Sequence, residues 1–366
     1  MSACLIGLSG GEARQQAHDA NVAPVQRVVH PLYEQLQRQL AAYEASWAQL
    51  PQTPVRPGPT LTKGAVGERV AALRHRLGLP SGERFDTVLA ARVSAFQSAH
   101  GLPPTGDANA ATVAALNKGA GPYEDLIQLN LDRLRALPGD PGRRYLLVDV
   151  AAARLWLYEN GRPVHSMRVV VGKPDQQTPE MMGVIRYMVF NPYWNLPPDI
   201  TRASIAPNAT KYGPEWVSDA GYEVLSSWAS DAAVVRPATI EWRAVAAGDE
   251  VVRVRQRPGP GNMMGRVKFM FPNSRGIYLH DTPHRRAFAG DARVASAGCV
   301  RVEDAERLAR WLAGVGFEDA TGAPEQRIDL AQPVPVYLIY LTASPGADQI
   351  VFRPDIYQRD RQGAST

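Results

Sequence analysis

The sequence predicts an α+β protein of more than one domain, with helices in the first part of the chain and a mostly β domain from Arg143 onward. Three observations lead to this prediction. Apolar residues recur at helical spacing in several stretches before residue 138. After residue 143, short β-forming runs alternate with turn residues, and a single clear helical stripe follows Cys299. The length of 366 residues also suits two or three domains better than one.

Composition narrows the class of protein. The formal net charge is only +4, and the basic residues, mostly Arg, are spread along the chain rather than clustered. That distribution argues against a dedicated nucleic-acid arm and is compatible with an anionic wall. Two cysteines, Cys4 and Cys299, do not form a disulfide scaffold. No apolar run is long enough to span a bilayer.

The first helical region is expected to be a scaffold built from residues 20–59 and 119–142. Residues 20–50 predict one helix, because apolar residues recur at three- and four-residue steps: Val28, Val29, Leu32, Leu36, Leu40 and Tyr43. A Pro-rich linker follows it at 51–59. A second helix is expected at 123–137, ended by the Pro- and Gly-rich stretch 138–142, and packed against the first.

Between these helices, residues 60–118 predict a compact unit of three helices. Each helix has its own apolar stripe: Val70, Leu73 and Leu77; Leu89, Val93 and Phe96; Val113 and Leu116. Asp86 is the expected N-cap of the second helix and Asp107 that of the third. The pairs and triplets Phe96-Gln97, His100-Gly101-Leu102 and Thr105-Gly106 resemble the peptidoglycan-binding domain, a three-helix module often attached to wall enzymes. His100 has no visible metal-binding partners, so no metal is predicted there.

Strands are predicted in the later part of the chain at 145–150, 154–158, 163–171, 183–190 and 333–341. Asn160-Gly161, between the second and third of these, is the strongest hairpin signal in the chain. A long aromatic stretch with many Pro and Gly residues, about 201–262, interrupts the strands. Long insertions beside a site are often lids.

The stretch from Gly276 to Arg310 carries the candidate chemistry. Ile277-Tyr278-Leu279 reads as a short strand that delivers His280, and a turn at Ser296–Gly298 delivers Cys299 before a helix that starts near Glu303. An imidazole beside a thiol removes its proton and stabilises the nucleophilic thiolate.

Backbone groups complete this expected site. Gly298 allows a close backbone approach, and the N–H groups of Gly298 and Cys299 are expected to face a developing oxyanion. Neighbouring strand residues point to opposite faces, so Asp281 is expected to point away from His280. A backbone carbonyl is then the expected third partner.

Together, His280-Asp-Thr-Pro and Ser296-Ala-Gly-Cys-Val-Arg-Val resemble the signature of the L,D-transpeptidases, bacterial cysteine enzymes that remodel peptidoglycan. His280, Ser296, Gly298, Cys299 and Arg301 match that signature, whereas Ala297 stands where many members have His. The larger periplasmic branch, which carries an inserted peptidoglycan-binding domain, tolerates a small residue there. Three further stretches resemble the same branch: Asn191–Pro198, Val267–Asn273 and Phe352–Tyr357.

The resemblance implies a fold and a reaction. Residues 143–342 would form a β-sandwich-like catalytic domain, with the insertion at about 201–262 capping its cleft and residues 343–366 packing on it as a tail. Cys299 would attack the carbonyl of the third residue of a tetrapeptide stem and release D-Ala, with His280 as base and then acid. The amine of a second stem would resolve the thioester and form a cross-link between third residues.

The same site leaves other acceptors open. Water would make the enzyme an L,D-carboxypeptidase, and a free D-amino acid would make it an exchange enzyme. The resemblance implies no metal or organic cofactor and implies acylation of Cys299 by carbapenems. Two other classes remain: a wall-binding scaffold without catalysis, which the Cys299 and His280 pair argues against, and a cytosolic-type cysteine peptidase, which would not explain the helical module.

Further residues are assigned to substrate binding. Tyr278 is expected to line the cleft, two residues before His280 and on the same face. Trp194 is expected to form a cleft wall with Asn195, although a core role is an equal alternative on residue type alone. Ser296 would either bond near His280 or steady the turn. Arg301 would either meet a substrate carboxylate or, as the favoured reading, form an internal ion pair.

Such an enzyme would work in the periplasm or cell envelope, yet no export signal is visible in this chain. Ala3–Leu8 is apolar but short and has no basic segment before it, so it is not a complete signal peptide. Either a signal has been removed or the start is truncated. Residues 1–19 are expected to be a flexible N-terminal segment.

Overall fold

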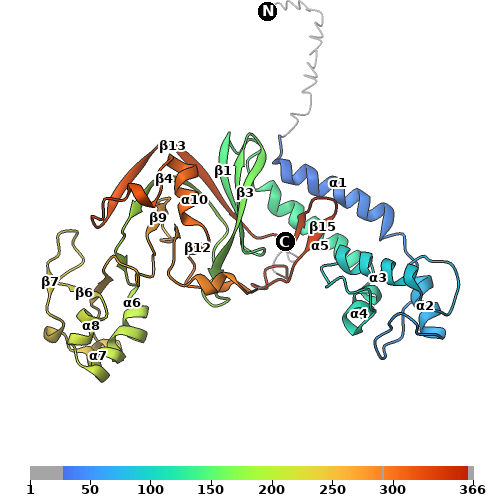
Figure 1. Cartoon of the computed structure of the whole chain (residues 1–366), viewed down its shortest axis with the longest axis horizontal. Helices are drawn as coiled ribbons and strands as arrows, with labels where there is room; N and C mark the ends of the chain where they lie inside the picture. The colour runs from blue at the N-terminus through green and yellow to red at the C-terminus, as the bar shows by residue number, and fades with distance from the viewer. Residues whose placement is uncertain (1–27, 291, 362–366) are drawn as a thin grey trace, which may run out of the picture.

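The computed structural model describes residues 28–290 and 292–361. The expectations for Cys4, for Ala3–Leu8 and for the segment 1–19 lie outside these residues. Three regions follow one another along the molecule: a small helical unit at one end, a β region in the centre and a mixed region at the other end (Figure 1). Within the described residues, no helix is both long enough and apolar enough to cross a membrane.

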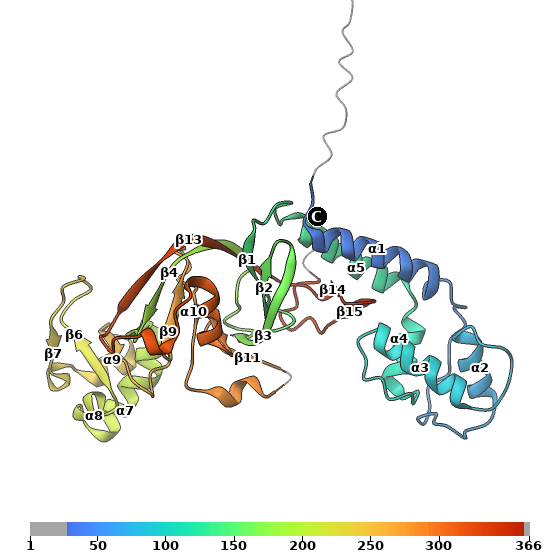
Figure 2. The same ribbon diagram turned by 45° about the horizontal axis from the view of Figure 1, so that its top comes forward.

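Two long helices, α1 (Pro31–Ser46) and α5 (Gly121–Arg135), lie side by side between the β region and the small helical unit (Figures 1 and 2). Their facing side chains form one apolar cluster that includes Leu36, Ile127 and Leu134. In the described part of the predicted helix 20–50, the helix begins only at Pro31, where the His30 side chain accepts from the Leu32 N–H. Proline suits the first helical position because its missing N–H would have no partner there.

The small unit contains α2 (Glu68–Arg76), α3 (Thr87–Ala99) and α4 (Ala110–Lys118) around its own core. The prediction of Asp86 as an N-cap is confirmed, since its carboxylate accepts from the Leu89 N–H at 2.8 Å. The prediction of Asp107 is wrong. Asn109 caps α4 by accepting from the Thr112 N–H at 2.9 Å, because the helix starts two residues later than expected.

Nine strands form the central sheet, in the order β11-β3-β12-β10-β9-β4-β13-β1-β2. Their bounds are β1 Arg144–Asp149, β2 Arg154–Glu159, β3 Arg162–Gly172, β4 Met181–Phe190, β9 Val267–Met270, β10 Leu279–His280, β11 Val294–Ser296, β12 Val300–Val302 and β13 Gln326–Ile339. Because β2 also pairs with β3, the sheet closes on itself. The expected sandwich is therefore corrected to a single barrel-like sheet. A sandwich needs two separate sheets that face each other, whereas here one sheet closes on itself.

The hairpin at Asn160-Gly161 makes this closure possible. Both residues have positive φ, 49° and 74°, as the predicted tight turn requires, and they connect β2 to the antiparallel β3. The predicted strand 333–341 covers only the second half of β13, which begins at Gln326. Its first half is largely exposed and the register shifts between Asp329 and Val334, so the apolar pattern that marks the second half is absent there.

Both faces of the sheet are covered at β1 and β13. The inner face packs against α10 (Ala305–Ala313) through a large cluster that includes Leu146, Val336 and Leu308. The outer face packs Tyr145 and other side chains against α1 and α5. A hairpin of β14 (Ala343–Pro345) and β15 (Ile350–Phe352) contacts the same two helices. The β region and the two long helices therefore share one apolar cluster.

The insertion forms the third region, with an apolar cluster of its own. Its helical pieces are α6 Pro198–Ile200, the π-helix η1 Thr201–Ile205, α7 Ala206–Tyr212, α8 Glu215–Asp219, the 3₁₀ turn η2 Pro237–Thr239 and α9 Trp242–Ala247. Its sheet has the order β5-β8-β6-β7, with β5 Trp194–Asn195, β6 Tyr222–Leu225, β7 Val234–Val235 and β8 Arg253–Gln256. Two short 3₁₀ turns, η3 Arg285–Phe288 and η4 Phe317–Asp319, lie outside it.

Candidate functional site

The imidazole of His280 is held by its own strand end. His280 closes the two-residue strand β10, between β9 and β12, and is only 2% exposed. Its Nδ1 lies 2.5 Å from the backbone oxygen of Asp281. A carbonyl oxygen can only accept, so Nδ1 carries the proton and Nε2 keeps a free lone pair. Burial lowers the pKa of His280 to about 3, with a further contribution from the Arg301 cation, so the ring is neutral at pH 7.

The prediction that a backbone carbonyl, rather than Asp281, orients this imidazole is confirmed. The Asp281 carboxylate turns to other partners. It accepts from the Arg266 N–H at 2.8 Å and pairs with the Arg285 guanidinium at 3.3 Å. It therefore fixes the neighbouring loops instead of forming a triad with His280.

The thiol of Cys299 lies in the short turn between β11 and β12 and forms no disulfide. Its Sγ donates to the Gly276 carbonyl at 3.7 Å. Burial raises the pKa of the Cys299 thiol, although the nearby Tyr278 groups and the Arg301 cation act in the opposite direction. Among the described residues, the thiol hydrogen bond goes to Gly276 rather than to His280, and such catalytic bonds often form only once substrate is bound.

Ser296 steadies the turn that carries Cys299. Its Oγ donates to the Cys299 carbonyl at 2.5 Å and accepts from the Gly298 N–H at 3.2 Å. Of the two roles expected for Ser296, the structure shows the one in which its side chain steadies the turn. The Gly298 N–H expected in an oxyanion site is thus already engaged within the turn. Of the two backbone donors expected to face an oxyanion, the Cys299 N–H is the one with no hydrogen-bond partner in the described part of the chain.

One cavity of about 880 Å³ collects most of the residues that the sequence singled out. Its lining includes seven of the eight predicted site residues, all but Gly298: Trp194, Asn195, Tyr278, His280, Ser296, Cys299 and Arg301. The Tyr278 and His280 rings meet edge to face with centroids 5.8 Å apart. The insertion contributes Ile200, Ser204 and Trp228 to the same lining, so it borders the site directly.

Cations dominate the charged side chains of this cavity. Lys173, Lys268, Arg275 and Arg301 line it, with Asp199 as the single acid among the described lining residues. Lys268 pairs with Glu325 at 3.2 Å outside this lining. The cavity is therefore suited to a ligand that carries carboxylates.

Arg301 is the most unusual of these cations. It sits opposite His280 in the parallel β10–β12 pairing. Within the described residues it forms no ion pair, and its Nε is buried without a hydrogen-bond partner. For the described residues, the favoured expectation of an internal ion pair is therefore wrong, because none of them brings an acid to this position. Burial lowers the pKa of this guanidinium, which marks it as poorly compensated.

Sequence reasoning missed several residues at this site. Thr178, which the sequence analysis did not single out, donates its hydroxyl proton to the Gly298 carbonyl at 2.8 Å. Trp228, Met264 and Arg275 line the cavity but carry no local signal, because each comes from an irregular segment brought in by the fold. For metals, the described residues contain no group of three or more His, Cys, Asp or Glu side chains that could hold an ion.

Two family models match the chain. The model of the "L,D-transpeptidase catalytic domain" matches residues 143–336, which is just over half of the sequence. The model of a "Putative peptidoglycan binding domain" matches residues 66–116. The first match contains every residue of the cavity described above, and the second covers α2, α3 and most of α4.

Individual proteins are also similar. A curated protein of Haemophilus influenzae named "Putative L,D-transpeptidase" is 34% identical over 248 residues, 64% of this chain and 48% of that protein. The match thus spans about half the length of that relative. Among solved structures, an L,D-transpeptidase from Xylanimonas cellulosilytica is 19% identical with a TM-score of 0.21, over 77% of this chain and 99% of that one. Another, from Mycobacterium smegmatis, is 11% identical with a TM-score of 0.26, over 54% and 58%. Both superpositions are loose, and neither carries an argument about the site.

Proposed function

Because the chain belongs to the L,D-transpeptidase family and also matches a peptidoglycan-binding domain, we propose that it is a peptidoglycan L,D-transpeptidase of the periplasm or cell envelope. Cys299 is the nucleophile, and His280 is the general base and acid. The observation that carries the proposal is the shared cavity of this thiol and an imidazole whose Nδ1 proton is fixed by the Asp281 carbonyl. That arrangement leaves Nε2 as an acceptor for the thiol proton.

The first half of the reaction acylates the enzyme. The Cys299 thiol passes its proton to Nε2 of His280 as the sulfur attacks the carbonyl carbon of the third residue of a tetrapeptide stem. The oxygen of that carbonyl becomes an anion, for which the Cys299 N–H is the proposed donor in place of Gly298. When the intermediate collapses, the carbon–nitrogen bond breaks, Nε2 returns the proton to the amine of D-Ala, and a thioester remains.

The second half releases the product. The side-chain amine of a second stem attacks the thioester carbonyl and gives a proton to Nε2 of His280. The carbon–sulfur bond then breaks, and the thiolate of Cys299 recovers the proton. The product is a cross-link between two third-position residues. Water in place of the amine yields a tripeptide, and a D-amino acid yields an exchanged stem.

The resting site starts from uncharged partners. Burial raises the pKa of the Cys299 thiol and lowers that of His280 to about 3, so the thiol and the imidazole are both neutral at pH 7. Proton transfer is then coupled to attack rather than complete beforehand. Tyr278 lines the same cavity, and burial raises the pKa of its hydroxyl, so that group also keeps its proton at pH 7.

Substrate recognition follows from the cavity lining. Arg301, half-buried beside His280 and without an ion-pair partner among the described residues, takes a free carboxylate of the stem peptide. Trp194, Asn195 and Tyr278 form walls for an extended peptide. The insertion, at about 201–262, caps the cleft, and Ser204 and Trp228 already line it.

The other regions have supporting roles in this proposal. Residues 60–118 hold the wall while the catalytic domain, residues 143–342, works on it. The helices in 20–59 and 119–142 connect the two, and the segment from residue 343 onward packs on the catalytic domain. A wall-binding protein without catalysis stays as the second candidate, because the helical unit alone would support it.

Mass spectrometry of purified tetrapeptide muropeptides, incubated with the protein or with Cys299→Ala, tests the proposal. We expect cross-linked dimers that have lost D-Ala, absent with the variant, and a mass increase on the unmodified protein after exposure to a carbapenem. Tripeptides alone would move the assignment to a carboxypeptidase. Binding to sacculi with no turnover and no acylation would favour the non-catalytic scaffold, and activity that survives in Cys299→Ala would overturn the mechanism.

A further inference from the structure

The loop that follows β3 forms hydrogen bonds to the turn that carries Cys299. The Lys173 N–H donates to the Ser296 carbonyl at 3.0 Å, and the Thr178 hydroxyl donates to the Gly298 carbonyl at 2.8 Å. Thr178 is fully buried, and its oxygen also accepts from the Gly172 N–H at 2.9 Å. The hydroxyl therefore ties the start of the loop to the residue just before the nucleophile.

This bond acts on the peptide unit that joins Gly298 to Cys299. A trans peptide is planar, and its C=O and N–H point in opposite directions. Fixing the Gly298 oxygen on Thr178 therefore fixes the direction of the Cys299 N–H on the other side of the same plane. The Gly298 residue itself has φ of +108°, a conformation that glycine adopts freely, so the chain alone does not hold this orientation firmly.

We infer that Thr178 is a positioning residue for the nucleophile: through the Gly298 carbonyl it sets the direction in which the Cys299 N–H meets the substrate oxyanion. The inference rests on the proposed function and names a residue outside the catalytic pair. Thr178 does not line the cavity that contains Cys299 and His280, so its effect passes through the backbone.

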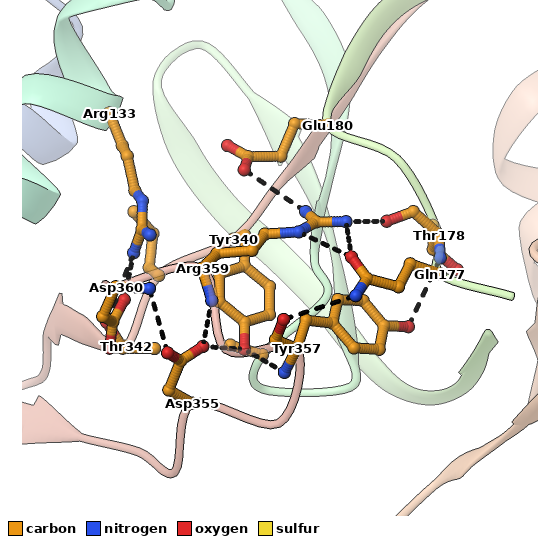
Figure 3. A network of polar contacts seen from close by, with 12 residues as sticks. Arg133, Gln177, Thr178, Glu180, Tyr340, Thr342, Asp355, Tyr357, Arg359 and Asp360 are labelled. Carbon is orange, nitrogen blue, oxygen red and sulfur yellow. Dashed lines mark hydrogen bonds and ion pairs between the residues drawn. The ribbon is translucent and has the colours of Figure 1, made fainter. Parts of the chain in front are cut away.

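Tyr357, near the end of the described chain, holds Thr178 in this place (Figure 3). Its hydroxyl donates to the Gly172 carbonyl at 2.6 Å and accepts from the Thr178 N–H at 3.3 Å. One phenol thus spans both ends of the loop. The loop is tight at that point, because a Cβ on Gly172 would lie 2.0 Å from the Gln176 carbonyl oxygen.

Arg359 adds a second support from the same C-terminal segment. Its guanidinium donates to the Thr178 carbonyl at 2.9 Å, to the Gln177 side-chain oxygen at 2.8 and 3.0 Å, and to Glu180 at 3.2 Å (Figure 3). A planar guanidinium that makes several bonds at once fixes the orientation of all its partners. The loop is therefore held at Gln177, Thr178 and Glu180 by one side chain.

The segment is in turn anchored to the barrel and to the scaffold. The Asp355 carboxylate accepts from the Tyr340 hydroxyl at 2.7 Å and from the Arg359 N–H at 2.9 Å. Asp360 pairs with Arg133 of α5 at 2.9 Å (Figure 3). The support of Thr178 thus reaches from Tyr340, directly after β13, and from α5 to the turn of Cys299.

Two variants separate the hydroxyl from the bulk of the side chain, in a Cys4→Ala background where Cys299 is the only thiol. Thr178→Val keeps the shape and removes the hydroxyl, whereas Thr178→Ser keeps the hydroxyl. Thr210→Val is the matched control, because Thr210 also donates to a carbonyl at 2.8 Å but lies in α7, outside the site. Each protein is tested for carbapenem acylation, which develops an oxyanion, and for alkylation by iodoacetamide, which does not.

For Thr178→Val we expect acylation to slow by about 10- to 100-fold, less than the loss of a whole oxyanion donor, with alkylation within roughly threefold of the parent. Thr178→Ser and the Thr210→Val control should acylate at close to the parent rate. Tyr357→Phe, which leaves Thr178 intact, should show a smaller loss of the same selective kind. It keeps the inference testable if Thr178→Val does not fold.

Several outcomes would overturn the inference. The first is acylation of Thr178→Val at the parent rate. The second is an equal loss of acylation rate in Thr178→Val and Thr178→Ser. The third is a parallel fall of the acylation and alkylation rates in Thr178→Val, which would mean that the turn has collapsed. If the parent protein itself neither forms a carbapenem adduct nor cross-links stems, the proposed function fails instead, and the inference with it. If the parent protein is active and Thr178→Val is equally active, the inference about Thr178 fails and the proposed function stands.

Discussion

Nδ1 of His280 lies 2.5 Å from the backbone oxygen of Asp281, the residue that follows it in the chain. The ring is thereby oriented by the backbone, without a carboxylate partner. A negative partner would raise the pKa of the imidazole, whereas burial here lowers it to about 3. The catalytic base that we propose is thus neutral throughout the physiological range.

The neutral pair predicts a particular pH dependence of Cys299 reactivity. In the Cys4→Ala protein, the rate of iodoacetamide alkylation should keep rising with pH past the ordinary thiol pKa of 9.0, because burial raises the pKa of Cys299. A thiolate–imidazolium pair would instead give a plateau that begins at low pH, roughly between the depressed thiol pKa and that of the imidazolium. Such a plateau would contradict the neutral resting state.

Asp281 should matter to the fold more than to the chemistry. Asp281→Ala leaves the Arg266 N–H without its acceptor, and we expect a loss of about 1–3 kcal/mol in stability. Carbapenem acylation by Asp281→Asn should stay within roughly tenfold of the parent, far from the 10⁴-fold loss seen when a triad carboxylate is replaced. Thermal melting and acylation rates check both expectations. A loss of activity that exceeds a thousandfold with intact melting would restore Asp281 as a triad member.

Arg301 should contribute to substrate binding without contributing to stability. Arg301→Gln removes a half-buried cation that has no ion-pair partner among the described residues, so the melting temperature should stay level or rise. kcat/KM for a stem with free carboxylates should fall by about 10- to 200-fold, the usual cost of one charged contact, mainly through KM. For stems in which the contacted carboxylate is amidated, the parent protein and Arg301→Gln should have similar activity. A lower melting temperature with unchanged KM would favour a structural role.

His100 should make the helical unit sensitive to acid. Its ring stacks on Phe96 at 3.9 Å, bonds to the Tyr43 hydroxyl at 3.1 Å, and joins the unit to α1 and to Phe352 of β15. Burial lowers the pKa of His100 to about 4, below its usual 6.5. The unfolded chain therefore binds this proton first, and stability is lost as the pH falls from 6.5 towards 4.

The size of that effect can be measured. Between pH 7 and pH 5, His100 alone should cost about 2 kcal/mol of stability. His100→Leu should be less stable than the parent at pH 7 but should lose correspondingly less on acidification. Thermal melting of both proteins at the two pH values gives the comparison, and an equal loss in both would show that His100 is not the group that titrates. His30, whose pKa is also lowered by burial, is present in both proteins, so its contribution to the loss of stability cancels in the comparison.

Local patterns determined much of this protein. The positive φ values at Asn160-Gly161, the cap at Asp86 and the strand positions each depend on residues within a few places of one another. The same holds for His280, whose partner is the next residue, and for the family signature around Cys299. Asp107 failed as a cap because two nearby residues of similar propensity compete, and only the exact start of the helix decides between Asp107 and Asn109.

Tertiary structure decided what depends on distant pairings. The barrel closes because β2 pairs with β3 while β13 pairs with β1, a contact nearly 200 residues apart that no local period encodes. Which side chains surround Arg301, none of them an acid that pairs with it among the described residues, is likewise set by the neighbouring strands. The bond from Thr178 to Gly298 joins residues 120 positions apart, and that from Tyr357 to Gly172 joins residues 185 apart. By itself, the sequence singled out the residues that we propose as nucleophile and base, because residue type and short spacing mark them. Their orientation depends on hydrogen bonds between segments that meet only when the chain has folded.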